Sequence, residues 1–534
     1  MLDRNQVLPY AIADLAQRAG ATTAVLDVTG PTVTYAELHD TILGWAAAYR
    51  RAGIDEGQTV VTMLPNSLEA YYAWLGVAWL RAIEVPANNM YLGTMLKYLV
   101  ENSEAETVLL ASRFVDRLAA VSADLPRLKR VIVPDATAAD PLPDLPCEVI
   151  RGDEFLGGVE PATDLEGPSH RDTMAIIYTS GTTGPSKGVL VPWAELYWFS
   201  TGMPDDMTSP GDRYYSPYPA FHISGKAALY VTALSEATLV IREMFSATEF
   251  WDDVRKHNIT VLALLGPLMS ILMQMPERDD DADNAVHSVG GGPIIPEIEE
   301  FKRRFGIPRH TTGFGMTETG IPITAGWNPP NFRTCGRPRE GRPGYEIRVV
   351  DEHGEPVRPG EVGELIVRCS EPWCMNLGYW KMPDKTAEAW RHGWFHTGDA
   401  FKVDDDGWLY FVDRIKDAIR RRGENISSFE VEAHINQHPA VQESAAVGVP
   451  SDLGEDDVKI SVVVKPTEEL TGEELIEFLI PRMPRFMVPR YVEIVTELPK
   501  TEATFRTQKV RLREQALNDN TWDREQAGIS LPKE

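Results

Sequence analysis

A short loop that combines glycines, hydroxyl side chains and one lysine is the part of this sequence best suited to bind a phosphate. Its sequence is YTSGTTGPSKGV, at residues 178–189. Glycine lets a phosphate approach the backbone closely, hydroxyl groups donate hydrogen bonds, and lysine supplies positive charge. The chain has a formal net charge of −27, so an anionic ligand needs local cations such as Lys187. We therefore expect a nucleotide at this loop.

The loop differs from the Walker phosphate loop of many ATPases. Ser186 stands where that loop has its last glycine, and Gly188 follows Lys187 where it has serine or threonine. The apolar segments MAIIY and GVLVP on either side both favour extended strands. A Walker loop instead opens a helix, whose dipole helps to bind phosphate. We therefore expect a strand–loop–strand unit, and not a kinase or a motor ATPase.

Four further motifs come after the loop along the chain. They are GFGMTETG at residues 313–320, GELIVR at 363–368, GWFHTGD at 393–399 and DRIKDAIRRRGENISSFEVE at 413–432. Together with the loop, in this order, they resemble the adenylate-forming superfamily of acyl-CoA synthetases, adenylation domains and luciferases, over nearly the whole chain. The resemblance implies that MgATP converts a carboxylic acid to an acyl-adenylate, and that the site must neutralise the charge gathering at the α-phosphate.

The resemblance assigns most of these residues to ATP. It places the β- and γ-phosphates on Thr179, Ser180, Gly181, Thr182, Thr183, Gly184 and Lys187. In GFGMTETG, the hydroxyl of Thr317 would bind the α-phosphate and Glu318 would ligate Mg²⁺, which takes few carboxylates beside phosphate oxygens. The adenine would lie between two segments, which consist of Phe314, Gly315 and Met316 on one side and Gly291, Gly292 and Pro293 on the other. Phe314 stands where the family usually has a tyrosine.

The motifs near residue 400 imply a ribose site and a hinge. Asp399 would accept both ribose hydroxyls, and Arg414 would reinforce it. A turn cap for Asp399 and an ion pair with Asp413 for Arg414 are the structural alternatives. Lys416 corresponds to the family's hinge residue, about which the C-terminal domain would rotate between two half-reactions. Gly423 would face the tunnel for the pantetheine arm of coenzyme A.

The C-terminal catalytic loop departs from the family pattern. The family usually has LPKTxxGKxxR, whose second lysine bridges the carboxylate and the α-phosphate, whereas this chain has LPKTEATFRTQKVRLRE at residues 498–514. With one inserted residue, Arg506 takes the place of that lysine, and Lys509 lies three residues further on. Arginine is a planar fork and lysine a compact charge, so the two are not interchangeable. We favour Arg506; the alternatives are that Lys509 reaches in or that adenylation is impaired.

The segment PAFHISGKAALY at residues 219–230 lies where the family builds its acid pocket. The resemblance places Phe221, His222 and Gly313 beside the acid. Amino-acid-activating members usually have an aspartate near His222, so an amino acid substrate is disfavoured. Lys226 either pairs with an acidic substrate group or lies on a helix face, and we favour the helix face.

The predicted activity is that of an AMP-forming acid–CoA ligase that uses ATP, Mg²⁺ and coenzyme A. The RRRGENISSFEVE and EATFRTQK segments are similar to crotonobetaine/carnitine–CoA ligases and to fatty-acyl or sterol-side-chain CoA ligases. Two alternatives stay open: an acyl-AMP ligase that passes the acyl group to a carrier protein, and a non-catalytic nucleotide-binding homologue. A requirement for coenzyme A separates the first alternative, and pyrophosphate release separates the second.

The elements that must position these residues alternate between short apolar runs and helix-period segments, which predicts an α/β fold. TVVTML precedes SLEAYYAWLGVAWLRA, and TVLLA precedes RFVDRLAAV. After about residue 340 the segments alternate with period 2 and predict a β-rich subdomain with a hairpin turn at residues 404–407. We expect a large N-terminal adenylation domain at residues 1–413 and a small mobile α+β domain at residues 414–534, with its own strands SAAVGVP and VKISVVVK.

Composition bounds the setting. Four cysteines, none in CxxC spacing, favour reduced thiols and no zinc site. The net charge of −27 disfavours nucleic-acid binding. The most apolar run, VLALLGPLMSILMQM, is too short to span a membrane and predicts a buried strand followed by a helix. The N-terminus lacks the pattern of a signal peptide. We expect a cytoplasmic protein whose partners are a small carboxylic acid and coenzyme A, and a homodimer is left open.

Overall fold

A computed structural model describes residues 2–179, 186–414, 419–421, 424–451, 456–500, 507–515 and 517–531. By its internal contacts the chain forms two compact units. The first comprises Met1–Ile347 with Val367–Phe395, and the second comprises Arg348–Ile366 with His396–Glu534. The units therefore interleave along the sequence between residues 348 and 395. A single boundary near residue 413, and a mobile domain after that boundary, stay predictions.

The first unit contains a sheet that is parallel except at one edge. Its strands lie in the order β7 (Glu148–Arg151), β6 (Arg130–Val133), β5 (Thr107–Leu110), β3 (Thr59–Met63), β4 (Ile83–Pro86), β8 (Thr173–Thr179) and β9 (Lys187–Pro192). Only β9 runs antiparallel to its neighbour, β8. These two strands flank the glycine-rich loop, so the predicted strand–loop–strand unit is confirmed.

A second sheet of the first unit carries the strands nearest to the other nucleotide motifs. Its order is β16 (Thr334–Pro338), β15 (Gly320–Trp327), β14 (Arg309–Met316), β13 (Ser288–Gly290), β12 (Val261–Ala263), β10 (Arg213–Tyr215), β11 (Thr238–Ile241), β1 (Thr23–Asp27) and β2 (Thr32–Thr34). The strands β10, β12, β13 and β14 are mutually parallel. Their carboxyl ends therefore meet at one edge of the sheet.

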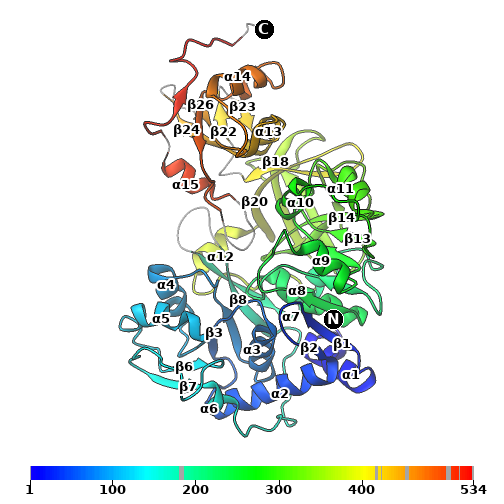
Figure 1. Cartoon of the computed structure of the whole chain (residues 1–534), viewed down its shortest axis with the longest axis vertical. Helices are drawn as coiled ribbons and strands as arrows, with labels where there is room; N and C mark the ends of the chain where they lie inside the picture. The colour runs from blue at the N-terminus through cyan, green and yellow to red at the C-terminus, as the bar shows by residue number, and fades with distance from the viewer. Residues whose placement is uncertain are drawn as a thin grey trace. The chain divides into compact units, whose positions relative to one another are not determined.

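Helices cover both sheets. In the first unit they are α1 (Leu8–Arg18), α2 (Tyr35–Arg51), α3 (Leu68–Trp79), α4 (Gly93–Ser103), α5 (Val115–Ser122), α6 (Gly152–Leu156), α7 (Trp193–Ser200), α8 (Ile223–Ser235), α9 (Phe250–Lys256), α10 (Gly266–Gln274), α11 (Ile298–Phe305) and α12 (Pro383–Ala389), with 3₁₀ turns η1 (Arg4–Gln6) and η2 (Ser112–Phe114). Helices α9, α10 and α11 pack with β12 and β13 in one apolar core (Figure 1). A second core joins α1, α2, α3 and α8 to the first sheet. Gly76 of α3 allows this packing, because a Cβ there would lie 2.9 Å from the Cβ of Trp45.

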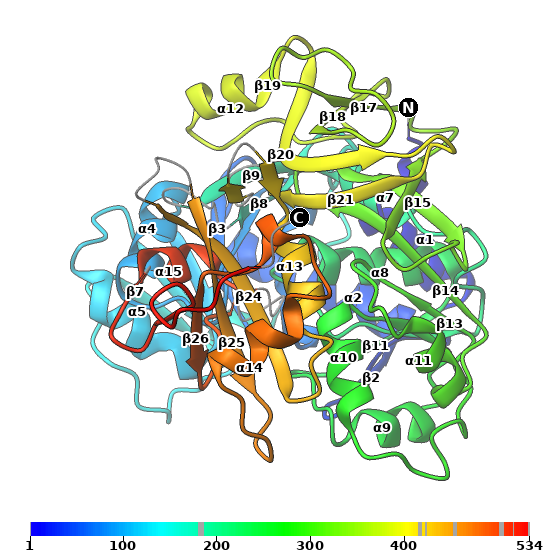
Figure 2. The ribbon, with the colours of Figure 1, turned by 90° about the horizontal axis from the view of Figure 1, so that it is seen from above.

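The second unit combines a β-rich segment with a small α+β layer structure. Its strands are β17 (Tyr345–Val350), β18 (Val362–Cys369), β20 (Trp394–Val403) and β21 (Leu409–Arg414), then β22 (Ile419–Arg421), β23 (Glu424–Ile426), β24 (Val441–Pro450), β25 (Asp456–Val464), β26 (Tyr491–Val495) and β27 (Trp522–Asp523). The strands β17, β18 and β20 each have residues in both units, and the two-residue β19 (Trp390–Arg391), which pairs with β20, belongs to the first unit. Its helices are α13 (Ser428–Ile435), α14 (Gly472–Leu479) and α15 (Lys509–Glu514), with the 3₁₀ turn η3 (Arg485–Met487). Helices α13 and α14 cover one face of the β24–β27 sheet and α15 the other (Figure 2).

The α/β class, the hairpin between β20 and β21 and the strands β24 and β25 confirm the sequence expectations. So does VLALLGPLMSILMQM, which forms β12 and then α10. One expectation is wrong: Cys369 and Cys374 form a disulfide, because the turn after β18 brings their Cα atoms to 6.7 Å. Cys147 and Cys335 keep their thiols. Among the described residues, no helix is long and apolar enough to cross a membrane.

Candidate active site

Three of the predicted site segments lie at the carboxyl edge of the second sheet. Phe221 and His222 come after β10, and Gly291 follows β13 directly. Phe314 lies near the carboxyl end of β14. Parallel α/β sheets bind ligands outside the carboxyl ends of their strands, where loops and helix starts leave backbone groups exposed. The edge is thus where the fold offers a binding site, and the sequence motifs are brought together there.

Glycines at this edge allow two motifs to touch. A Cβ on Gly292 would lie 2.4 Å from the carbonyl oxygen of Gly313, and a Cβ on Gly291 would lie 2.0 Å from that of Leu264. Gly291 also donates its backbone N–H to the carbonyl of Thr311, at 3.3 Å. The GGGP turn therefore packs directly against the GFGMTETG strand, as an adenine pocket built from both segments requires. A larger residue at Gly292 would push the GGGP turn away from Gly313.

The glycine-rich loop closes on a hairpin. Thr179, the last residue of β8, pairs directly with Lys187, the first residue of β9. The hydroxyl of Thr179 donates to the carbonyl of Lys187 at 3.5 Å. The predicted phosphate-binding residues Ser180, Gly181, Thr182, Thr183 and Gly184 lie outside the described residues.

Tyr379 joins the hairpin to the turn that carries the predicted Mg²⁺ ligand. The Nζ of Lys187 lies 4.6 Å from the centre of its ring, and its hydroxyl donates to Oε1 of Glu318 at 3.2 Å. Asn376 fixes the same turn, since its side chain donates to the carbonyl of Glu318 at 2.6 Å. Lys187 and Glu318 therefore both contact the side chain of Tyr379. Sequence reasoning missed Tyr379 and Asn376, because the NLGYW segment has no spacing that marks them.

A second carboxylate lies beneath this turn and was also missed. Glu195, on α7, is fully buried, and neither of its carboxylate oxygens has a well-formed hydrogen bond among the described residues. Burial raises the pKa of Glu195 well above its ordinary value, and the nearby charge of Glu318 raises it further. Burial and the charge of Glu318 thus both favour the protonated form of Glu195. Glu318, the predicted Mg²⁺ ligand, is itself only 6% exposed.

Two of the residues predicted to contact the acid lie at the start of α8. His222 is the residue before the first turn of that helix, and its ring lies 4.7 Å from the ring of Phe221. Gly225 lets the preceding loop fold back on the helix, because a Cβ there would lie 2.2 Å from the carbonyl of Pro219. The two predicted residues are thus presented together on a tightly packed loop.

Lys226 corrects an expectation. It neither lies on an exposed helix face nor is available to a substrate: it is fully buried and forms an ion pair with Glu84 of β4. Its Nζ also lies 4.1 Å from the ring of Trp74. The ion pair with Glu84, which is 142 residues away in sequence, offsets the cost of burying the charge of Lys226.

In the second unit, the predicted ribose residues form an ion pair. Asp399 and Arg414 are register partners on β20 and β21, and Nε of Arg414 lies 2.8 Å from Oδ1 of Asp399. The carboxylate is 1% exposed and the arginine 36%. Asp413 instead accepts hydrogen bonds from Ser428, so the alternative pair of Arg414 with Asp413 through their side chains does not form among the described residues.

The predicted catalytic cations of the last loop divide between described and undescribed residues. Lys509 begins α15, and its Nζ lies 2.8 Å from Oε1 of Glu432 and donates to the hydroxyl of Ser428. Arg506, Lys416 and Gly423 lie outside the described residues. Which cation serves the reaction therefore stays a prediction.

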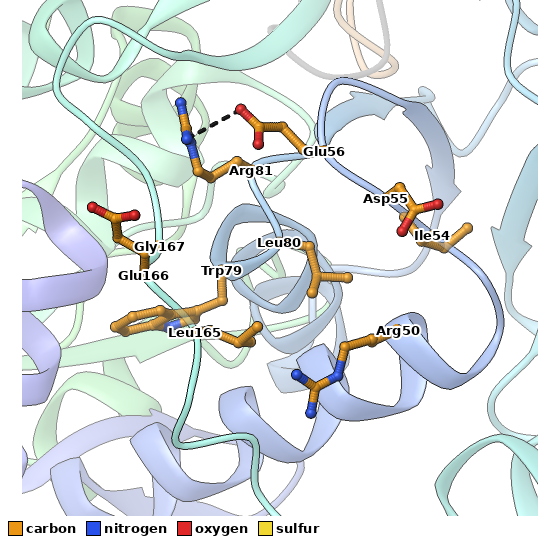
Figure 3. Close-up of a pocket in the computed structure, with 10 residues that line it drawn as sticks. All are labelled: Arg50, Ile54, Asp55, Glu56, Trp79, Leu80, Arg81, Leu165, Glu166 and Gly167. Atoms are coloured by element: carbon orange, nitrogen blue, oxygen red, sulfur yellow. Dashed lines mark ion pairs between the residues drawn. The ribbon is translucent and has the colours of Figure 1, made fainter.

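A surface hollow of about 240 Å³ lies elsewhere in the first unit (Figure 3). Arg81 and Glu56, which line it, form an ion pair at 3.1 Å, and Arg50 beside them pairs with Asp164 at 2.9 Å. None of the predicted site residues is in its lining. Both of its arginines are held in ion pairs, so the hollow gives no reason to move the candidate site away from the motifs.

Comparison with known proteins identifies the matching family. A model of the AMP-binding enzyme family matches residues 12–380, and a model of the AMP-binding enzyme C-terminal domain matches residues 430–504. Two curated relatives are each named crotonobetaine/carnitine–CoA ligase. The one from Citrobacter koseri is 31% identical over 91% of this chain and 95% of the relative, and the one from Escherichia coli O8 is 32% identical over the same shares.

Solved structures extend the likeness to three dimensions. ATP-bound MatB from Rhodopseudomonas palustris has a TM-score of 0.81 and 25% identity, covering 96% of this chain and 98% of that one. A benzoate CoA ligase from Burkholderia xenovorans LB400 has a TM-score of 0.82 and 25% identity, covering 95% of this chain and 99% of that one. The expected fold class is confirmed on both counts.

Proposed function

Because this chain belongs to the family of AMP-binding enzymes, we propose that it is an AMP-forming acid–CoA ligase. In the first half-reaction a carboxylate oxygen of the acid attacks the α-phosphorus of ATP, and the bond to the β-phosphate breaks to release pyrophosphate. In the second, the thiol of coenzyme A attacks the acyl carbon, loses its proton, and displaces AMP. Adenylation is needed because a free carboxylate has no adequate leaving group, whereas AMP is a good one.

The observation that carries this proposal is the contact of Tyr379 with both Lys187 and Glu318. It brings the predicted phosphate-binding cation and the predicted metal ligand to one side chain. A metal-bound triphosphate needs both groups from the protein. The cation binds its phosphate oxygens, and the carboxylate binds its metal. The relatives' names and the ATP-bound neighbour point to the same chemistry.

Each motif then has a role in holding ATP. We assign Lys187, Thr179 and residues 180–184 to the β- and γ-phosphates, and Thr317 to the α-phosphate. Glu318 fits Mg²⁺, which accepts a single protein carboxylate when phosphate oxygens complete its shell. Among the described residues no group of three acidic, histidine or cysteine side chains competes for a metal. Asp399, reinforced by Arg414, accepts the ribose hydroxyls.

The acid and the acceptor are assigned with the same residues as the sequence suggested. Phe221, His222 and Gly313 would contact the acid, and the lack of an aspartate near His222 favours an acid without an ammonium group. Arg506 would stabilise the charge on the α-phosphate, Lys416 would be the hinge, and Gly423 would leave room for the pantetheine arm. Since the reaction consumes ATP and coenzyme A, we place it in the cytoplasm, and a homodimer stays a prediction.

The direct test is pyrophosphate release from MgATP across a panel of aliphatic, aromatic and trimethylammonium carboxylates, each with and without coenzyme A. We expect release with at least one acid and an acyl-CoA product, identified by mass, only when coenzyme A is present. Release without thioester formation would indicate transfer to a carrier protein. No release from any acid would favour the non-catalytic homologue and contradict the proposal.

Two substitutions identify the cation of the last loop. R506A should lower pyrophosphate release by about a hundredfold or more, the size expected for one group that stabilises transition-state charge. K509A should leave release within a few-fold of the parent, because Lys509 already pairs with Glu432. R506K is the matched control that retains charge and loses the planar fork. The reverse result, loss in K509A alone, would assign the clamp to Lys509.

A further inference from the structure

Glu364, in the GELIVR motif, uses both of its carboxylate oxygens on the segment that carries Asp399. Its Oε2 lies 2.7 Å from Nδ1 of His396, and its Oε1 accepts the backbone N–H of Gly398 at 3.1 Å. Its side chain is 18% exposed and that of His396 is 12% exposed. A glutamate on β18 therefore binds the first and the third residue of the four that end at Asp399.

The remaining residue of that segment is held by the same strand. The hydroxyl of Thr397 donates to the carbonyl of Leu365 at 2.7 Å and accepts the backbone N–H of Asp399 at 3.1 Å. Gly398 has a φ of +71°, a backbone conformation that glycine adopts at little cost. The part of β20 just before Asp399 is thus held to β18 by Thr397 and by both carboxylate oxygens of Glu364.

We infer that Glu364 is a positioning residue for ribose recognition: it fixes the part of β20 that aims Asp399 at the two ribose hydroxyls. This inference rests on the proposed function, in which Asp399 binds those hydroxyls. Asp399 forms an ion pair with Arg414 on β21, on the other side of β20 from Glu364 (Figure 2). The carboxylate is therefore held from two directions, by Arg414 through its side chain and by Glu364 through its backbone.

The geometry explains why a structural contact would have a functional role. Hydrogen bonds to a carboxylate are strong only when the distances are right, and an error of about 1 Å in a binding group can cost on the order of a hundredfold. Asp399 is 1% exposed, so it cannot recover a lost position by swinging into solvent. Loosening β20 at Gly398 should therefore weaken the contact with ribose while the unit stays folded.

The test measures binding of AMP against 3′-deoxy-AMP by calorimetry, which needs no turnover. The parent protein should prefer AMP by roughly tenfold to a hundredfold, the value of a hydrogen bond to a charged group. E364A should lose most of that preference while its affinity for 3′-deoxy-AMP changes little. E364Q retains one oxygen acceptor and should lie between the two. D399N gives the reference for complete loss of the preference.

Two further variants protect the test against misfolding. E346Q changes a glutamate of the neighbouring strand β17, which pairs with Arg368 on the surface, and should leave the preference unchanged. H396N preserves a donor near the position of Nδ1 and should retain more of the preference than H396A. If E364A and E364Q lower thermal stability but discriminate AMP from 3′-deoxy-AMP as the parent does, Glu364 is only structural and the inference fails.

The failure of this inference can be told from failure of the proposed function. A parent protein that prefers AMP in binding but releases no pyrophosphate with any acid would overturn the ligase proposal and leave the role of Glu364 intact. A parent that releases pyrophosphate, with E364A showing the parent's ratio of KM values for ATP and 3′-deoxy-ATP, would overturn the role of Glu364 alone.

Discussion

Two lysines that the sequence offers to a ligand each pair with a glutamate, one in each unit. Lys226 on α8 pairs with Glu84, whose other oxygen accepts the hydroxyl of Thr62 at 2.8 Å. Lys509 on α15 pairs with Glu432, which also accepts the backbone N–H of Ala446 at 2.8 Å. In both places a helix is joined through its lysine to a glutamate that already has a second hydrogen bond.

The two pairs differ in depth and in what they connect. Lys226 is fully buried, whereas Lys509 and Glu432 are each 16% exposed. The first pair joins two layers of one core. The second joins α15 to α13, whose Ser428 also donates to Asp413 at the end of β21. Residue type alone offers both lysines as ligand-binding cations, and only their depth and partners separate a core element from a connector.

The largest effect expected from this comparison is on stability, in K226M. Removing the lysine leaves Glu84 charged and buried without its partner, which costs about 3–5 kcal/mol. The double variant K226M/E84M removes both charges and should recover most of the loss, since apolar replacements of buried pairs are often tolerated. Thermal unfolding of the three proteins, followed by circular dichroism, measures the difference.

Acid binding supplies the control for K226M. Because Lys226 does not reach a ligand, the double variant should bind the acid substrate with nearly the parent's KM. A double variant that is stable but has lost the acid would show that Lys226 serves the substrate after all. A double variant as unstable as K226M would show that the pair itself, and not the orphaned charge, stabilises the core.

The second effect is smaller and belongs to Lys509. K509M should lower stability by about 1–3 kcal/mol, because water can reach the site and partly replace the lysine at Glu432 and Ser428. K465M is a matched control in the same unit, because Lys465 donates to the uncharged carbonyl of Pro439, at 2.7 Å in an exposed contact. K509M should melt earlier than K465M, by calorimetry. Equal melting of the two would mean that the Lys509 pair contributes nothing measurable.

The fold was predictable from sequence because its signals are local. The apolar segments SAAVGVP and VKISVVVK marked β24 and β25, and the apolar run at residues 261–275 marked β12 and α10. The motifs were also local, and the structure brings Gly292 against Gly313 and Asp399 against Arg414 as their assigned roles require. The roles of all the site residues stay predictions, and residues 180–184, 416, 423 and 506 among them lie outside the described residues.

The identity of distant partners could not be read from the sequence. Glu84 and Lys226 are 142 residues apart, and Glu318 and Tyr379 are 61 apart. A periodic pattern shows which face of an element is buried, but not which polar group lies on the opposing element. Lys226 was therefore assigned to a surface, Tyr379 was missed, and the Cys369–Cys374 disulfide was not foreseen. Each of these errors concerns a tertiary contact and none concerns an element's type.

The smallest expected effect is on the pH dependence of stability. It should have opposite signs for two Glu–Lys pairs of the second unit, Glu432–Lys509 and Glu493–Lys459. Burial raises the pKa of Glu432 despite the opposing effect of Lys509. Burial also acts to raise the pKa of Glu493, but there the hydrogen bonds from Lys459 and Asn518, at 2.7 and 2.6 Å, outweigh it and leave the pKa below its ordinary value. The two glutamates should therefore respond oppositely to acid.

The direction depends on which state binds the proton more tightly. Glu432 takes up its proton in the folded state at a higher pH than in the unfolded chain, so its contribution to stability grows as pH falls toward the ordinary value of 4.5 and is lost as pH rises through the folded pKa. Glu493 contributes stability above 4.5 and loses it as pH falls through its lowered folded pKa. Relative to the parent, E432Q should therefore lose melting temperature on going from about pH 7 to about pH 5, and E493Q should gain it only below about pH 4. Differential scanning calorimetry of the three proteins across that pH range measures these shifts in melting temperature. Shifts of the same sign in both variants would mean that Lys509 neutralises Glu432 as fully as Lys459 neutralises Glu493.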